Sequence, residues 1–307
     1  MNESTADMAR QLIDGPPTDT APQAGPSWLT IADIGKLPTY REGLPTITTG
    51  FGTFDGVLNG GFRPESVYIL AGRTGSAKST VASNMVRRVA LTGACVLLFK
   101  LEESPTEAIW RMHAAAAQVD LARLLDGAEL SNGERVALRD GWSLIENLPI
   151  RVSEARNIFD IDRIATEHAA DGGKLVVIDQ LSMIEYPGAA VGYETATQIS
   201  AHLRRLARTL HLPMLLVVQV NRAASRGRER LTCNDLRDSG ALENDACAVL
   251  LIDRIRPPDV CATDPCTLEI LVGKSRYGRT TRDKDGPLEL LWWPRCCRVE
   301  DGKGAQE

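Results

Sequence analysis

Apolar residues along the chain fall into two kinds of segment that alternate, short unbroken runs and longer stretches with helical spacing. The short runs are typical of buried strands in a parallel sheet, and the longer stretches are typical of helices that cover such a sheet. Helices are predicted at 80–91, 105–126, 134–147, 158–170 and 195–210. Strands are predicted at 67–71, 95–101, 149–152, 174–179, 212–219, 249–253, 267–273 and 288–293. This alternation predicts one α/β domain with a mainly parallel twisted sheet flanked by helices.

The two ends of the chain differ from this alternating core. Residues 1–27 are rich in Pro, Gly, Ala, Thr and Asp and have few large apolar side chains, so this tail is predicted to be disordered. Residues 28–42 hold a segment of near-helical spacing, which is either a linker helix that docks on a neighbour or a simple cap. The domain itself is predicted to span 43–300, followed by a tail at 301–307.

Composition is that of a globular protein. Of the 307 residues, 43% are hydrophobic and 24% are charged. No apolar run is long enough to span a membrane and the polar N-terminus resembles no signal peptide, so a cytoplasmic location is expected. The seven cysteines follow no zinc-ligand spacing and are expected to be reduced thiols. The net charge of −5 argues against a uniformly basic nucleic-acid surface but is compatible with a local basic channel.

A glycine-bearing loop follows the first predicted strand and leads into the first predicted helix. It consists of Gly72, Arg73, Thr74, Gly75, Ser76, Ala77, Lys78, Ser79 and Thr80. This order favours a phosphate-binding loop, because backbone N–H groups and a helix N-terminus then face the anion. Lys78 adds a positive charge, Ser79 offers a hydroxyl to Mg²⁺, and Ala77 stands where the usual pattern has its second glycine. The alternative is an ordinary glycine turn before a helix.

Polar residues follow three of the predicted strands, at the sheet edge where ligands of α/β proteins gather. Asp179 ends the strand at 174–179 and is suited to hold Mg²⁺ beside Ser79. Glu102 and Glu103 follow the strand at 95–101; either carboxylate can accept the proton of a water that attacks a γ-phosphate, and spacing does not choose between them. Gln219 ends another strand, where its amide either senses the γ-phosphate or binds a neighbouring loop.

Basic residues gather in two later segments. The predicted loop at 221–230 contains Arg222, Arg226, Arg228 and Arg230. Such a loop suits a nucleic-acid backbone, and the alternative is a solvated surface loop. Lys274 and Arg276 follow a later strand and begin a predicted C-terminal β-hairpin, where they either bind an anion or reach a nucleotide held by a neighbouring copy.

These blocks, in this order, resemble the C-terminal ATPase domain of the DnaB-type replicative helicases, which are RecA-like P-loop ATPases. The matching blocks are 43–62, 72–79, 99–104, 177–183, 219–222 with 235–246, and 274–278. The resemblance implies a RecA-like fold, ATP and Mg²⁺ as cofactors, and a role in DNA replication. It also implies a homo-oligomeric ring, a hexamer in the family, that moves along single-stranded DNA from 5′ to 3′.

Residue by residue, the resemblance implies a role for each matching position. It places the triphosphate and Mg²⁺ on Lys78, Ser79 and Asp179, selects Glu102 as the catalytic carboxylate, and makes Gln219 the γ-phosphate sensor. It implies that Arg276, with Lys274, reaches the ATP bound by the adjacent subunit. It also matches Arg237, Asp238 and Gly240 to the family's DNA-contacting loop.

Two departures from the family pattern matter. Ala77 replaces a glycine, and we expect nucleotide binding to survive while the methyl group crowds the loop or slows turnover. Only about forty residues precede the family match, so we expect the family's N-terminal domain to be missing and the chain to be a stand-alone motor of a bacterium, phage or mobile element.

A helicase loader, primase and polymerase are the partners that the resemblance implies. The alternatives are a RecA- or RadA-like recombination ATPase and a catalytically weak ATP-binding ring component.

Overall fold

The structure is a computed structural model that describes residues 30–37, 43, 45–127, 129–188, 193–220, 230–236, 239–257, 265–281 and 286–302. The chain divides into two compact units, Met1–Leu44 and Pro45–Glu307. In the first unit the described residues form the one-turn helix α2 (Ile31–Ile34), which begins with a capping box between Thr30 and Asp33. Trp28, where the predicted linker helix begins, lies outside the described residues.

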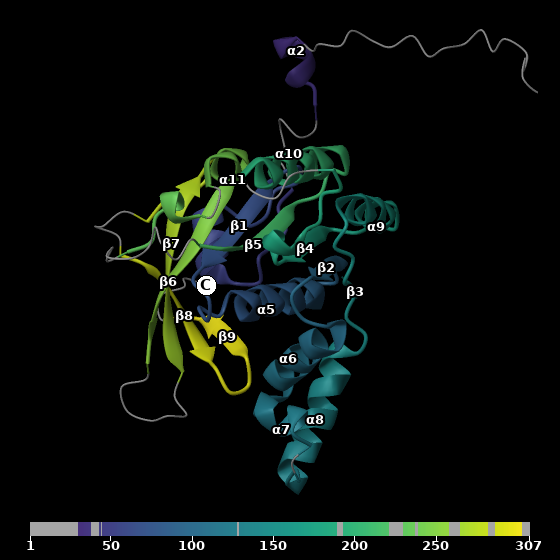
Figure 1. Cartoon of the computed structure of the whole chain (residues 1–307), viewed down its shortest axis with the longest axis vertical. Helices are drawn as coiled ribbons and strands as arrows, with labels where there is room; N and C mark the ends of the chain where they lie inside the picture. Colours follow the sequence, from purple (N-terminus) through teal and green to yellow (C-terminus); the bar gives the residue numbers. More distant parts are fainter. Residues whose placement is uncertain are drawn as a thin grey trace, which may run out of the picture. The chain divides into compact units, whose positions relative to one another are not determined.

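A nine-stranded sheet forms the centre of the second unit within the described ranges (Figure 1). Its strand order is β3-β2-β4-β5-β1-β6-β7-β8-β9. Neighbours from β3 to β6 are parallel, and β7, β8 and β9 are added in antiparallel fashion. The strands are β1 (Val67–Gly72), β2 (Val96–Lys100), β3 (Ile150–Ser153), β4 (Leu175–Asp179), β5 (Met214–Gln219), β6 (Ala248–Arg256), β7 (Cys266–Ser275), β8 (Leu288–Trp293) and β9 (Arg298–Asp301).

Helices cover both faces of this sheet (Figure 1). Alternate residues of β1 show the division, because successive side chains of a strand point to opposite faces. Tyr68 and Leu70 pack in a core with α4 (Gly52–Leu58), α5 (Lys78–Leu91) and α6 (Pro105–Ala117). Val67, Ile69 and Ala71 pack in a second core with α9 (Ile158–Ala170) and α10 (Tyr193–Thr209). The predicted α/β fold with a mainly parallel sheet and an antiparallel C-terminal region is confirmed.

The predicted helix at 105–126 is wrong in one respect, because it is two helices. α6 begins at a capping box formed by Ser104 and Glu107 and ends at Gln118, whose φ of 56° is left-handed. α7 (Leu121–Leu125) then begins at Asp120, whose side chain accepts a hydrogen bond from the N–H of Ala122. α8 (Asn132–Ile145) follows and packs on α6. A single polar residue in a left-handed conformation therefore breaks a stretch that has continuous helical spacing.

Among the elements of the second unit that were not predicted are α4 and β9. α4 forms within the glycine-rich segment before β1, and β9 lies at the end of the domain. The Asp301 carboxylate of β9 accepts hydrogen bonds from the N–H groups of Gly52 (3.2 Å) and Thr53 (2.9 Å) in the first turn of α4. These bonds satisfy N–H groups at a helix end that has no side-chain cap of its own. The last strand therefore holds the start of the first helix of this unit.

The remaining described elements are short. They are the 3₁₀ helices η1 (Leu181–Met183) and η2 (Cys233–Asp235) and the helix α11 (Ser239–Asp245), which packs on α10. Across the described ranges, no helix has both the length and the apolar composition needed to cross a membrane.

Candidate active site

The glycine-bearing loop joins the carboxyl end of β1 to the amino end of α5. A β-carbon on Gly72 would lie 2.4 Å from Ser76 Oγ and 3.0 Å from the carbonyl oxygen of Ile252 in β6, so only glycine fits there. Gly75 has a φ of 77°, which favours glycine as well. The loop thus lies at the carboxyl ends of the parallel strands, the edge at which α/β sheets bind ligands.

Ala77 occupies the N-cap position of α5 with a left-handed φ of 65°. This conformation explains why the usual loop pattern has glycine there, since it costs a non-glycine residue about 1–2 kcal/mol. The methyl group of Ala77 packs against the apolar core beneath α5, which offsets part of that cost. The loop therefore keeps its turn with alanine in the glycine position.

Replacing Ala77 with glycine is expected to stabilise the folded state by up to about 1 kcal/mol, because the relief of backbone strain exceeds the loss of methyl burial and the added freedom of the unfolded chain. Urea unfolding measures this change. The control is Ala82→Gly inside α5, where glycine is expected to destabilise by about 1 kcal/mol or more. Equal destabilisation by both substitutions would show that Ala77 is not strained. Because the variant restores the usual loop pattern, we also expect its ATP turnover to rise.

A pocket of about 300 Å³ opens beside this loop. It is lined by the loop residues Thr74, Gly75, Ser76, Ala77, Lys78, Ser79 and Thr80, and by Glu102, Arg111, Gln180, Gln219 and Trp292. The structure therefore brings the predicted Glu102 and Gln219 to the phosphate loop. Gly72 and Arg73 form the start of the loop without lining the pocket, and the Arg73 guanidinium donates to the carbonyl oxygen of Asp253 at 3.0 Å.

Lys78 is held inside the loop. Its side chain is buried, and Nζ donates to the carbonyl oxygen of Arg73 at 2.7 Å. Burial lowers the pKa of Lys78, while the negative charges of Asp179 and Glu102 act in the opposite direction. A phosphate oxygen is a stronger acceptor for this ammonium group than a neutral carbonyl, because a hydrogen bond between two charged groups is the stronger kind.

Asp179 lies at the end of β4 and is buried. One carboxylate oxygen, Oδ1, accepts a hydrogen bond from Ser79 Oγ at 3.1 Å, and the other, Oδ2, accepts one from Lys100 Nζ at 2.5 Å. Hydroxyl and carboxylate oxygens are the ligands that Mg²⁺ prefers. Ser79 and Asp179 therefore place a donor set that fits the predicted magnesium ion at the edge of the pocket.

The two neighbouring glutamates after β2 have different surroundings. Glu103 lies between two cations, with Oε1 2.5 Å from Lys100 Nζ and Oε2 2.9 Å from Arg111 Nε. Glu102 lines the pocket and makes no hydrogen bond or ion pair to any residue in the described ranges. Both carboxylate oxygens of Glu103 are occupied by cations, whereas the Glu102 carboxylate faces the pocket, where it can contact a water molecule. The geometry therefore supports Glu102 as the proton acceptor.

Gln219 connects the end of β5 to the phosphate loop. Its Nε2 donates to Thr74 Oγ1 at 2.6 Å, and its Oε1 lies 3.5 Å from Nε2 of Gln180. Gln180 is buried and also donates to Ser182 Oγ at 3.0 Å. The sequence prediction missed Gln180, although its position directly after the strand that ends in Asp179 was a usable signal. The two amides place polar groups on one wall of the pocket.

Lys274 and Arg276 lie at the opposite edge of the sheet from the pocket. Lys274 Nζ donates to the carbonyl oxygens of Glu243 and Asn244, and Arg276 Nη2 donates to that of Asn244 at 2.8 Å. Ser275 of β7 pairs with Ala248 at the start of β6, whereas the phosphate loop begins beside Ile252, four residues along that strand. Four residues span about 13 Å. Neither cation lines the pocket of its own chain.

The predicted DNA-binding residues are only partly within the described ranges. Arg222, Arg226, Arg228, Arg237 and Asp238 lie outside them. Gly240 is exposed in α11. Arg230 is described, and its guanidinium lies 3.6 Å from a carboxylate oxygen of Glu269 and 3.9 Å from one of Asp253. These contacts leave the DNA-binding prediction untested.

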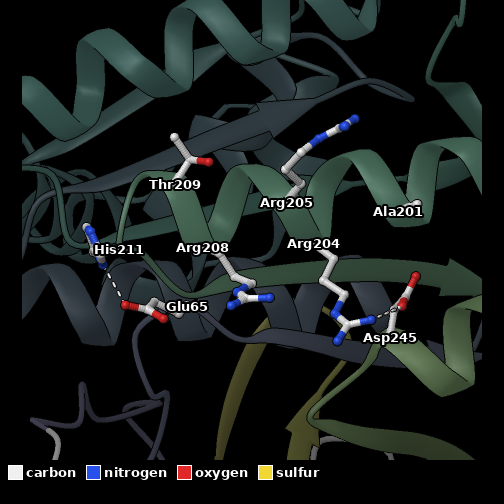
Figure 2. A pocket seen from close by; sticks show the side chains of 8 residues that line it. All are labelled: Glu65, Ala201, Arg204, Arg205, Arg208, Thr209, His211 and Asp245. Carbon is white, nitrogen blue, oxygen red and sulfur yellow. Dashed lines mark hydrogen bonds and ion pairs between the residues drawn. The ribbon is translucent and has the colours of Figure 1, made fainter. Parts of the chain in front are cut away.

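A second groove, of about 650 Å³, lies at the amino edge of the sheet (Figure 2). Arg204, Arg205 and Arg208 of α10 line it together with Glu65, His211 and Asp245. Arg204 turns toward Asp245, to which it donates at 2.9 Å, and His211 pairs with Glu65 at 2.5 Å. Side chains of both charges, rather than the N–H groups of a glycine-bearing loop, line this groove. The smaller pocket at the carboxyl edge, which the glycine-bearing loop lines, is therefore the one that matches the predicted phosphate site.

Together, the fold and the pocket define a class: a phosphate-loop nucleotide-binding protein built on a RecA-like sheet. The family model described as DnaB-like helicase C terminal domain matches residues 46–292, and the chain belongs to this family.

Two curated relatives show the extent of the match. The chain is 28% identical to the replicative DNA helicase DnaB of Haemophilus influenzae over 260 residues, which are 80% of this chain and 54% of the relative. It is 30% identical to the replicative DNA helicase DnaB of Buchnera aphidicola subsp. Baizongia pistaciae over 295 residues, which are 91% of this chain and 61% of the relative. The chain therefore spans somewhat more than half the length of these relatives.

Two solved structures share the fold. One is an ATPase domain, which superposes with a TM-score of 0.73 at 20% identity, over 85% of this chain and 92% of that chain. The other is a DnaB-like replicative helicase studied for its interactions with primase, which superposes with a TM-score of 0.73 at 21% identity, over 85% of this chain and 62% of that chain. At this identity the likeness confirms the RecA-like fold and nothing finer.

Proposed function

We propose that this chain is the motor of a DnaB-type replicative DNA helicase, which binds ATP in the pocket beside residues 72–80 and couples hydrolysis to movement along single-stranded DNA. The observation that supports it best is the meeting of the phosphate loop with Glu102, Asp179 and Gln219 at one edge of the sheet, in a chain that belongs to this helicase family.

Each predicted residue at the phosphate loop has a role in this proposal. The loop N–H groups, the amino end of α5 and Lys78 hold the phosphates. Ser79 and Asp179 hold Mg²⁺, which when bound neutralises charge on the phosphates. Glu102 orients the attacking water and accepts its proton. Gln219 responds to the γ-phosphate through its amide. It lies two residues before segment 221–230, and this position links the response to the arginines expected to contact DNA.

The active site is completed by a second copy of the chain. Lys274 and Arg276 do not line their own pocket, so in a closed ring they serve the ATP of the neighbouring subunit. The ring is proposed to be hexameric, with Arg222, Arg226, Arg228, Arg237, Asp238 and Gly240 in its channel. A loader, primase and polymerase are proposed as partners, and primase is supported by the structurally similar helicase that was studied with it.

Steady-state ATP hydrolysis with and without single-stranded DNA tests this proposal. We expect DNA to stimulate turnover of the native chain, and Lys78→Ala to lower kcat by about 10²-fold or more because the charged donor to the phosphates is lost. The control is Lys174→Ala, which changes an exposed lysine just before β4 and is expected to keep native turnover.

The same preparation separates the alternatives. Strand displacement on a forked duplex is expected of a helicase and not of a RecA- or RadA-like recombination ATPase. ATP binding without turnover, even with DNA present, would contradict the motor and favour a catalytically weak ring component.

A further inference from the structure

Lys100 is a buried cation beside Asp179, next to the predicted nucleotide site. It is the last residue of β2, and its side chain is 1% exposed. Its Nζ lies 2.5 Å from Asp179 Oδ2 and 2.5 Å from Glu103 Oε1. Lys100 and Asp179 are register partners on the adjacent parallel strands β2 and β4. The pairing of the two strands therefore holds this cation beside the carboxylate that is expected to bind Mg²⁺.

Lys100 belongs to a continuous row of charges that runs from α6 to the phosphate loop. Arg111 of α6 contacts Glu103, Glu103 and Asp179 both contact Lys100, and Asp179 accepts a hydrogen bond from Ser79. The two cations and two carboxylates of this row balance each other. In the described part of the chain, Lys100 is the one cation within 4 Å of the Asp179 carboxylate. A buried carboxylate needs such a partner, because an unpaired charge is poorly solvated in the interior.

We propose that Lys100 is a positioning residue that holds one oxygen of Asp179 and thereby makes magnesium binding depend on nucleotide. The inference rests on the proposed function, in which Ser79 and Asp179 hold Mg²⁺. With Oδ2 bound to Lys100, the oxygen bonded to Ser79 is the one turned toward the phosphate loop. The ammonium charge beside it repels a second cation. Magnesium therefore binds weakly to the protein alone and tightly only when the phosphates of ATP add negative charge.

The test is the response of the nucleotide-free protein to divalent cation. Lys100→Met keeps the length and apolar stem of the side chain and removes the charge. Mg²⁺ without nucleotide is expected to change the Tm of the native chain little and to raise that of Lys100→Met by several degrees. Mn²⁺, measured directly by paramagnetic resonance, is expected to bind the variant about tenfold or more tightly, because a like charge a few ångströms away has been removed.

Two further variants keep the test decisive. Lys100→Met leaves Asp179 without its cation and Glu103 with Arg111 alone, and the variant can fail to fold. Lys100→Met with Glu103→Gln, which removes one of the two negative charges, is therefore measured in parallel. Lys100→Arg restores the charge and is expected to restore the weak native response. Adding Asp179→Asn to Lys100→Met is expected to abolish the tight Mn²⁺ binding. Equal cation responses of the native chain and the Lys100→Met variants would overturn the proposal.

Asp179→Asn in the native background separates this inference from the proposed function. We expect it to remove the Mg²⁺ dependence of binding of a fluorescent ATP analogue. If that dependence is lost but Lys100→Met responds to cation as the native chain does, the magnesium site stands and the inference about Lys100 is wrong. If the dependence persists, Asp179 does not hold the metal, and both the proposed site and the inference built on it are wrong.

Discussion

Replacing Arg276 with alanine is expected to lower DNA-stimulated ATP turnover by about 10³- to 10⁵-fold, which corresponds to about 4–7 kcal/mol of activation barrier. The reason is that an arginine aimed at the γ-phosphate neutralises charge that develops only in the transition state. Because Arg276 lies away from the pocket of its own chain, ATP affinity is expected to change far less than kcat. Arg279→Ala, which removes an exposed arginine of the same turn, is the matched control and is expected to keep most activity.

Mixing two inactive variants tests whether Arg276 acts on a neighbour. An Arg276→Ala copy retains an intact pocket, and a Lys78→Ala copy retains an intact Arg276. In a mixed ring some interfaces combine the two intact halves, so activity is expected to reappear although neither variant is active alone. If mixing restores no activity while both variants assemble, Arg276 does not act between copies.

Replacing Glu102 with glutamine is expected to lower kcat by about 10²- to 10⁴-fold while ATP binding persists, because the amide has the same shape but cannot accept a proton. Glu103→Gln is the matched control, one residue away and with the same chemical change. It removes a partner of Lys100 and Arg111, so it is expected to lower the free energy of unfolding by about 1–3 kcal/mol and to affect chemistry much less. Single-turnover hydrolysis and urea unfolding of both variants measure the two effects. The opposite pattern would assign the proton acceptor to Glu103.

Much of the sheet and the phosphate loop could be predicted because their signals are local. The strands β1, β2, β4 and β5 lie between two helical layers, so β1, for example, is buried along its whole length and appears in the sequence as an unbroken apolar run. β9 was missed because Val299 is its single apolar residue; it is a strand because it pairs with β8. Gln118 was missed as a helix end because a left-handed glutamine leaves no pattern in the sequence.

The finer features of the site depend on contacts between distant residues. Glu102 and Glu103 are identical in type and adjacent in sequence, and the resemblance chose between them by family pattern. The physical difference is the pair of cations around Glu103, of which Arg111 comes from the following helix. Trp292, from a strand near the end of the domain, was not predicted to line the pocket at all. Ala77 shows the converse, because its place in the loop was predicted but its left-handed conformation was visible only in the structure.

The contact between Asp301 and the first turn of α4 has a consequence for how the protein is made. Gly52 and Thr53 leave the ribosome 249 and 248 residues before Asp301 does, so during that interval the amino end of α4 has water as its hydrogen-bond acceptor. α4 also packs against β8, which is synthesised long after α4. The central parallel strands can pair while the chain is still growing, whereas α4 reaches its final contacts only when the carboxyl end of the domain has emerged.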